Sequence, residues 1–112
     1  MDYQKKFASG AVEFEYGNIG LGIVFPTLYV VSVLITTNEA PTSAGSATIE
    51  YVSADESNEF GGVIYSQNMN GRTAWYRTLS RLPLLKNEKL KITYANPNDR
   101  QVGVTIFATT QP

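Results

Sequence analysis

Two carboxylates are the first residues in this chain whose type and spacing could do chemistry. Glu13 and Glu15 stand two positions apart, so on a strand they would share one face. Paired carboxylates act as acid and base in sugar hydrolysis. The same spacing is typical of the outer face of an edge strand, which has no cleft around it. We therefore expect a solvated face here and no catalytic residue in the chain.

A second group of carboxylates could bind calcium through oxygen ligands. It lies in the acidic run Asp55–Glu59. The calcium loop of an EF-hand requires glycine at its sixth position, where the flexible backbone makes a sharp turn. The sixth residue counted from Asp55 is Phe60. We expect a solvated loop, and we predict neither a metal nor a cofactor.

Aromatic residues offer a different chemistry, which is recognition. Trp75 and Tyr76 are adjacent, so on a strand they point to opposite faces, and we expect one in the core and the other exposed. An exposed aromatic ring can anchor a protein interface or stack on a sugar. Arg72, Arg77 and Arg81 flank the pair and could bind carboxylates of a partner, although solvated arginines are the alternative.

Composition excludes several classes of function. The 112 residues include no cysteine and no histidine, which argues against zinc and copper sites and excludes Ser-His-Asp and Cys-His catalysis. The net charge of −1 offers no basic excess for a phosphate backbone, so we expect no nucleic-acid partner. Charged residues make up 17% of the chain, against about 25% in ordinary soluble domains. This deficit indicates either a weakly solvated surface or a surface that a partner covers, and we expect the second.

A long window without charge runs from Tyr16 to Asn38. A membrane helix of about 20 residues would fit its length. Its first third is crowded with glycine, however, and its second half is rich in Val, Ile, Tyr and Thr, which favour strands. We predict a strand over Leu21–Phe25, a break at Pro26, and a long strand over Leu28–Thr37 that is covered on both faces. We expect no membrane association.

Other segments alternate between apolar and polar residues, as half-buried strands do. They are Ala11–Tyr16, Ser46–Ser53, Gly62–Gln67, Thr73–Leu79, Glu88–Ala95 and Gln101–Thr109. With the two strands of the charge-free window this makes about eight strands and no helix. The predicted fold is all-β: one antiparallel β-sandwich domain over residues 1–112, as an eight-stranded jelly roll. An immunoglobulin-like sandwich is the alternative.

Turn residues separate these strands. Asn70-Gly71 is the strongest short signal for a β-hairpin with a type I′ turn, because both central positions need positive φ. Asn96–Asp99 predicts a second hairpin, in which Pro97 sets φ. The region Arg81–Asn87 is predicted to be a connection through Pro83.

The first nine residues predict a short arm. Tyr3 and Phe7 alternate with polar residues and lysines, and we expect this segment to become ordered on a partner, with a frayed end as the alternative. No signal peptide is predicted, because Glu13 and Glu15 interrupt the apolar stretch that such a peptide needs. Near the other end, Phe107 falls on the outward phase of the last strand, so the second sheet or a partner must cover it.

The segments "VLITTNEAPTSAGSATIEYVSAD", "VIYSQNMNGRTAWYRT" and "LPLLKNEKLKITYANPNDRQVGVTIFATT" carry a family resemblance. The loop "TTNEAPTSAG" and the late segment "NEKLKITYANPNDRQVGVTIF" resemble those of small all-β virion proteins of tailed phages, of the podovirus capsid decoration, staple or cement type. The resemblance covers roughly Val33 to Thr110. It implies a jelly roll that clamps a capsid shell, and it supplies no functional residues.

From this resemblance and the charge-poor composition we expect a non-enzymatic virion protein that stabilises a phage head by docking on the major capsid protein. Its expected partners are a capsid or other virion protein and further copies of itself, in a dimer or trimer. It would be made in the host cytoplasm and located in the virion. The partner-binding candidates are Tyr3, Phe7, Trp75, Tyr76 and Phe107. The alternative is a receptor- or carbohydrate-binding module of a phage tail or fibre, and a small enzyme that uses carboxylates is a third hypothesis.

Overall fold

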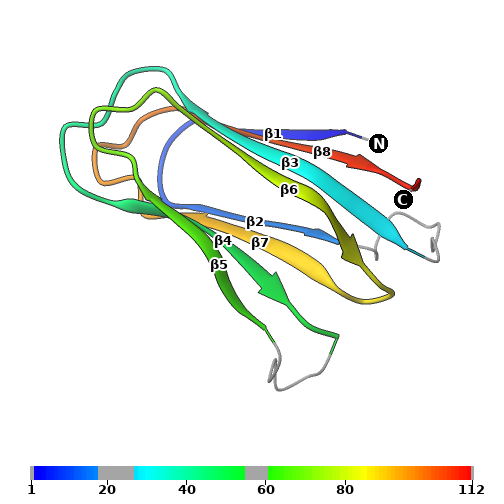
Figure 1. Ribbon diagram of the computed structural model, residues 1–112. Coiled ribbons are helices and arrows are strands. Elements are labelled where there is room, and N and C mark those ends of the chain that lie inside the picture. The colour runs from blue at the N-terminus through cyan, green and yellow to red at the C-terminus, as the bar shows by residue number, and fades with distance from the viewer. Residues whose placement is uncertain (1, 18–26, 55–60, 112) are drawn as a thin grey trace.

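The computed structural model describes residues 2–17, 27–54 and 61–111, which form two packed sheets (Figure 1). The predicted strand over Leu21–Phe25, the break at Pro26 and the acidic run Asp55–Glu59 lie outside these ranges. The strands are β1 (Tyr3–Phe7), β2 (Val12–Gly17), β3 (Leu28–Thr37), β4 (Ser46–Val52), β5 (Gly62–Asn68), β6 (Ala74–Leu84), β7 (Lys89–Tyr94) and β8 (Val102–Thr109). Among the described residues there is no helix with the length and hydrophobicity needed to span a membrane.

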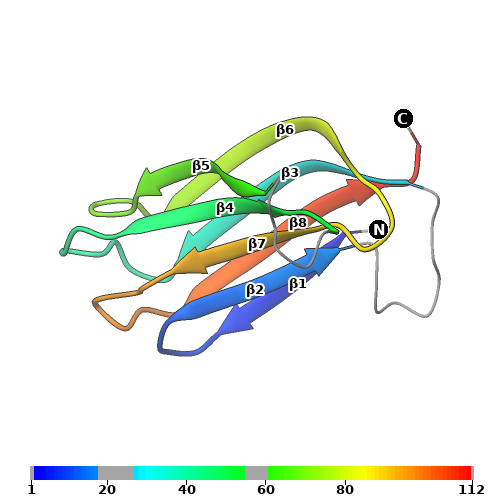
Figure 2. The same cartoon turned by 90° about the horizontal axis from the view of Figure 1, so that it is seen from below.

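The strand order is that of a jelly roll. The first sheet has the order β1-β8-β3-β6 and the second the order β2-β7-β4-β5, and all pairs are antiparallel (Figure 2). The pairs β1–β8, β2–β7, β3–β6 and β4–β5 are nested, as in one long hairpin that has been rolled up. The predicted fold class is confirmed, and the immunoglobulin-like alternative is excluded because its strands are divided differently between the sheets.

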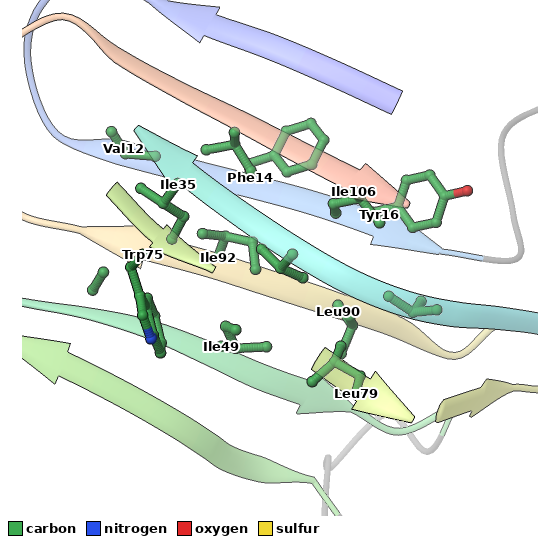
Figure 3. Close-up of a cluster of buried hydrophobic side chains, with 14 of the residues drawn as sticks. Val12, Phe14, Tyr16, Ile35, Ile49, Trp75, Leu79, Leu90, Ile92 and Ile106 are labelled. Carbon is green, nitrogen blue, oxygen red and sulfur yellow. The ribbon is translucent and has the colours of Figure 1, made fainter. Parts of the chain in front are cut away.

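The core lies between the sheets and follows the predicted alternation. Every second residue of β2, β7 and β8 is buried, and the residues between them, which are mostly polar, face outward. Figure 3 shows part of this layer, in which side chains from both sheets meet: Val12, Phe14, Tyr16, Ile35, Ile49, Trp75, Leu79, Leu90, Ile92 and Ile106. With no cysteine in the chain, this apolar layer holds the two sheets together.

The long apolar strand β3 has the predicted bounds but is not fully buried on both faces. It lies in the middle of the first sheet, where its inward residues are buried, while Tyr29, Leu34 and Thr36 on the outer face remain partly exposed. Its register to both neighbours shifts between Val30 and Ser32, which marks a β-bulge. The outer face is therefore available for contact.

Strand β6 is longer than predicted. It continues beyond Leu79 to Leu84, so Pro83 lies in a strand and not in a connection. Because β6 is the edge of its sheet, the missing N–H of proline breaks no hydrogen bond to a neighbouring strand. Ser80 and Arg81 have φ angles of 50° and 60°, and this left-handed pair bends β6 opposite the bulge of β3.

The segment predicted to be an arm forms strand β1 instead. Residues Tyr3 to Phe7 pair with Val102 to Ile106 of β8. The ring of Tyr3 stacks on Phe14 of the other sheet, with 5.5 Å between the ring centroids. Backbone pairing and this aromatic contact together explain why the segment is ordered without a partner.

Neither predicted hairpin forms, although both turns do. The turn at Asn70-Gly71 joins β5 of the second sheet to β6 of the first, and Arg72 N–H donates to Met69 O at 3.0 Å. Only Gly71 has positive φ, 78°, which is the type II pattern. The second turn, closed by Asp99 N–H and Asn96 O at 3.0 Å, likewise carries the chain from β7 to β8 in the other sheet.

Candidate functional site

On three of the four strands of the first sheet, the residues that the pairing registers place on the outer surface carry no charge. They are Tyr29, Ser32, Leu34 and Thr36 of β3, Ala74, Tyr76, Thr78 and Pro83 of β6, and Gly103, Thr105, Phe107 and Thr109 of β8. We call these residues the neutral face. The exposed Arg81, at the bend of β6, has no partner residue in these registers.

Apolar side chains lie at the centre of the neutral face. Leu34 pairs with Tyr76 on one side and with Thr105 on the other, and Ser32 pairs with Phe107. Tyr76 is 60% exposed, and Leu34 and Phe107 are partly exposed. The alternation of strands positions them, because their neighbours in sequence form the core. An aromatic and aliphatic centre surrounded by threonines is typical of a contact surface between proteins.

The outer surface of the second sheet has the opposite character. Lys89 Nζ lies 2.8 Å from Glu15, and Lys91 Nζ lies 3.1 Å from Glu13. The hydrogen bond and negative charge of Glu13 raise the pKa of Lys91. Glu13 and Glu15 are therefore exposed partners of lysines on a solvated strand face, as expected. The second sheet thus faces water with ion pairs, whereas the neutral face of the first sheet is formed by residues without charge.

The sequence candidates do not gather in one place. Tyr76 and Phe107 lie on the neutral face, whereas Trp75 points inward and is only 9% exposed (Figure 3). Tyr3 and Phe7 lie on the inward phase of β1, where they pack at the open side of the sandwich. The prediction that Trp75 and Tyr76 face opposite ways is confirmed.

Two of the three arginines near Trp75 interact with their own chain. The Arg77 guanidinium lies over the ring of Tyr65, 3.9 Å from its centroid. Arg81 donates to the carbonyl oxygen of Gln111 at 3.1 Å. Arg72 lies in the exposed turn before β6. These contacts leave Arg72 as the arginine best placed to meet a partner's carboxylate.

An apolar groove opens beside the edges β5 and β6, with a volume of about 400 Å³. It is lined by Tyr51, Ile64, Leu82, Pro83, Leu85 and Glu88. At one end the Tyr51 hydroxyl donates to Glu88, and Leu85 N–H donates to the same carboxylate at 2.7 Å. Burial, together with the hydrogen bond and charge of Glu88, raises the pKa of Tyr51 to about 12. Sequence reasoning missed this groove because Ile64 is the extra residue of a bulge, which strand alternation does not reveal.

A polar hollow of about 450 Å³ lies at one end of the neutral face. It is lined by Gln4, Lys5, Lys6, Thr36, Thr37, Asn38, Gln101, Val102 and Gly103. These residues come from β1, β3 and β8 and from the loops that follow β3 and precede β8. None of them was a sequence candidate. The available signal was Gly103, since a glycine within a regular strand often marks a close approach of another group.

Comparisons with known proteins add no identification. No protein-family model matches this chain, and no curated protein is significantly similar to it in sequence. The acidic run considered for calcium lies outside the described residues, and within the described ranges no cluster of three or more potential ligands could hold a metal ion.

Proposed function

We propose that this protein is a non-enzymatic structural protein of a tailed-phage virion, which decorates the capsid by docking on the major capsid protein. The observation that carries the proposal is the neutral face of the first sheet, with Tyr76, Leu34 and Phe107 at its centre. Removing water from a sheet face of this kind costs little free energy, because the face holds no charge that must be paired.

The architecture supports this proposal. Jelly rolls are common in viral capsid proteins. The sequence resemblance to phage decoration proteins covers β6 and β8, the strands that carry Tyr76 and Phe107. A decoration protein requires a rigid scaffold and a docking surface, and repetition around an icosahedral shell makes many modest contacts effective.

The second part of the proposal is self-association into a dimer or trimer within the virion. Light scattering coupled to size-exclusion chromatography, over a range of concentrations, measures this directly. A defined oligomer whose mass falls in a Tyr76→Asp variant would indicate that the neutral face also binds copies of the chain. A monomer at every concentration would contradict self-association, and only docking on the capsid would remain as the proposed function.

The docking proposal is tested by co-expressing this chain with the major capsid protein of the same phage genome and collecting the shells by sedimentation. Tyr76→Asp places a charge at the centre of the neutral face. Ser66→Asp is the matched control, because Ser66 is an exposed outward residue on the edge strand of the other sheet. We expect Tyr76→Asp to lower the occupancy of shells by about tenfold or more, and Ser66→Asp to leave it unchanged. Equal occupancy for both variants, or no binding of the unmodified protein, would contradict the proposal.

The alternative function, a receptor- or carbohydrate-binding module of a tail or fibre, depends on one exposed ring. Tyr76 could stack on a sugar, whereas Trp75 is buried and unavailable. A glycan array tests this alternative. Binding of a defined glycan that is lost in Tyr76→Ala and retained in Tyr76→Phe would favour it over capsid decoration.

A further inference from the structure

The polar hollow exists because one strand residue has no side chain. Gly103 lies on β8 between Lys6 of β1 and Thr36 of β3, all three on the outer face of the first sheet. A Cβ atom at this position would lie 2.9 Å from Thr36 Oγ1, closer than real side chains approach. The backbone of β8 therefore forms the floor of the hollow, and a ligand group can reach it.

The lining of the hollow is cationic at one side and neutral elsewhere. Lys6, on the outward phase of β1, contributes an ammonium group, whereas Lys5 lies on the inward phase. The other lining residues contribute amides, hydroxyls and backbone, with no carboxylate. Lys5 Nζ lies 5.3 Å from the centroid of the Phe7 ring. Gln4 donates one side-chain N–H to Thr105 Oγ1 at 3.1 Å, and its amide has a second N–H. The hollow therefore offers donors of hydrogen bonds around a net positive charge.

Lys6 differs from the lysines of the opposite sheet in its electrostatic partners. Lys89 and Lys91 each form an ion pair with a glutamate across their strands. Within the described ranges Lys6 forms no ion pair, although it is exposed beside a hollow. An unpaired ammonium group beside an acid-free hollow is complementary to an anion.

We propose that this hollow receives the carboxylate of an aspartate or glutamate side chain from the protein that docks on the neutral face. Gly103 and Thr36 belong to both the hollow and the neutral face, so a docked partner would lie over both. The inference rests on the proposed function, because it takes the occupant to be a protein. A polyanion such as nucleic acid fits less well, since one unpaired lysine on a chain of net charge −1 can neutralise a single carboxylate but not a run of phosphates.

The test uses amide NMR spectra of the whole chain and needs no capsid. Two capped tripeptides, Gly-Glu-Gly and Gly-Gln-Gly, are titrated separately, with inorganic phosphate as a third probe. We expect saturable shifts of the amides of Thr36, Asn38 and Gly103 with the glutamate peptide and none with the glutamine peptide. Equal responses to both peptides, no response to either, or stronger binding of phosphate would each overturn the assignment.

Substitutions then locate the binding group. Lys6→Gln is expected to weaken binding of the glutamate peptide by about fivefold, as for one partly exposed ion pair. Lys91→Gln, which removes a paired lysine from the other sheet, is the matched control and is expected to leave binding unchanged. The double variant Gly103→Leu with Thr36→Ala places a larger side chain over the floor of the hollow without the contact between Cβ and Thr36 Oγ1, and is expected to abolish binding. Unchanged binding in Lys6→Gln and in the double variant would overturn the proposal.

This experiment separates the two proposals. If the peptide binds as expected but the protein does not bind capsid shells, the hollow remains a carboxylate site and the proposed function fails. If shells are bound and the peptide is not, docking stands and the hollow has no part in it.

Discussion

At the scale of single residues, Trp75 and Tyr76 are neighbours with opposite roles. Trp75 pairs in register with Ile35 and points into the core, whereas Tyr76 pairs with Leu34 on the neutral face. We predict that Trp75→Ala lowers the free energy of unfolding by about 3–5 kcal/mol, because it opens a cavity between the sheets. Tyr76→Ala is predicted to change it by no more than about 0.5 kcal/mol.

Urea denaturation followed by circular dichroism measures both variants, since the signal does not depend on the single tryptophan. Similar losses of stability in the two variants would contradict the assignment of these residues to opposite faces. The sequence alone predicted that the rings diverge. It did not indicate which ring is buried, because that depends on the register with β3, a strand far away in the chain.

The hydrogen bond from Tyr51 to Glu88 predicts a loss of stability at alkaline pH. The pKa of Tyr51 rises from 10.0 to about 12 in the folded protein. Between these values the unfolded chain loses the phenolic proton before the folded chain does, so the stabilisation is complete below pH 10 and is lost as the pH rises toward 12. We predict that Tyr51→Phe makes the free energy of unfolding less dependent on pH over this range.

The measurement is urea denaturation at a series of pH values from below 10 to 12, with Tyr76→Phe as the control at an exposed phenol. An unchanged pH dependence in Tyr51→Phe would show that its environment does not stabilise the protonated form. Sequence reasoning did not find this pair, because Tyr51 is on β4 and Glu88 directly precedes β7, and the two meet only through the β4–β7 pairing.

At the scale of elements, the turn between β5 and β6 distinguishes the observed fold from the predicted hairpin. A type I′ turn needs positive φ at both central residues, whereas here only Gly71 has it. We predict that Gly71→Ala lowers the free energy of unfolding by about 1–2 kcal/mol, because a Cβ is strained at φ 78°. Asn70→Ala is predicted to be nearly neutral. Comparable losses in both variants, measured by urea denaturation, would instead support the hairpin geometry.

Local sequence identified most strands but not their partners. Alternating residues predicted β2, β4, β7 and β8 closely, since each buries one face. Turn residues such as Asn70-Gly71 indicate that the chain changes direction, yet they do not indicate which sheet the next strand joins. Strand β1 was missed because Lys5 occupies an inward position between Tyr3 and Phe7, which conceals the apolar alternation.

The candidate site was less predictable than the strands. Phe107 and Tyr76 were recognised as outward aromatic residues, but the neutral face exists only because β3, β6 and β8 lie side by side. The hollow at Gly103 requires β1 next to β8, a pairing between opposite ends of the chain. Such features depend on strand order, which composition and periodicity do not encode.

At the scale of the whole molecule, the nested strand pairs predict slow folding. The outermost pair brings Tyr3 beside Ile106, and among the strands in the described ranges only β4 and β5 are neighbours both in sequence and in a sheet. Closing such long loops costs entropy before any native contact compensates for it, and all-β proteins of this kind fold in about milliseconds to seconds. Stopped-flow refolding from urea measures the rate. A folding phase in the microsecond range would contradict this expectation.

The outermost strand pair also makes a circular permutation of the chain possible. Because β1 and β8 are antiparallel, the beginning of β1 lies at the same end of the sandwich as the end of β8 (Figure 1). A short linker from Thr109 to Tyr3, combined with a cut at Ala8–Ser9, would give a circular permutant in which β8 and β1 form a local hairpin. We expect it to adopt the same two sheets and to refold faster than the natural order. Such a result would show that the arrangement of strands in the two sheets does not require the natural order of strands along the chain. A chain that starts at β2 would then form the same sheet faces.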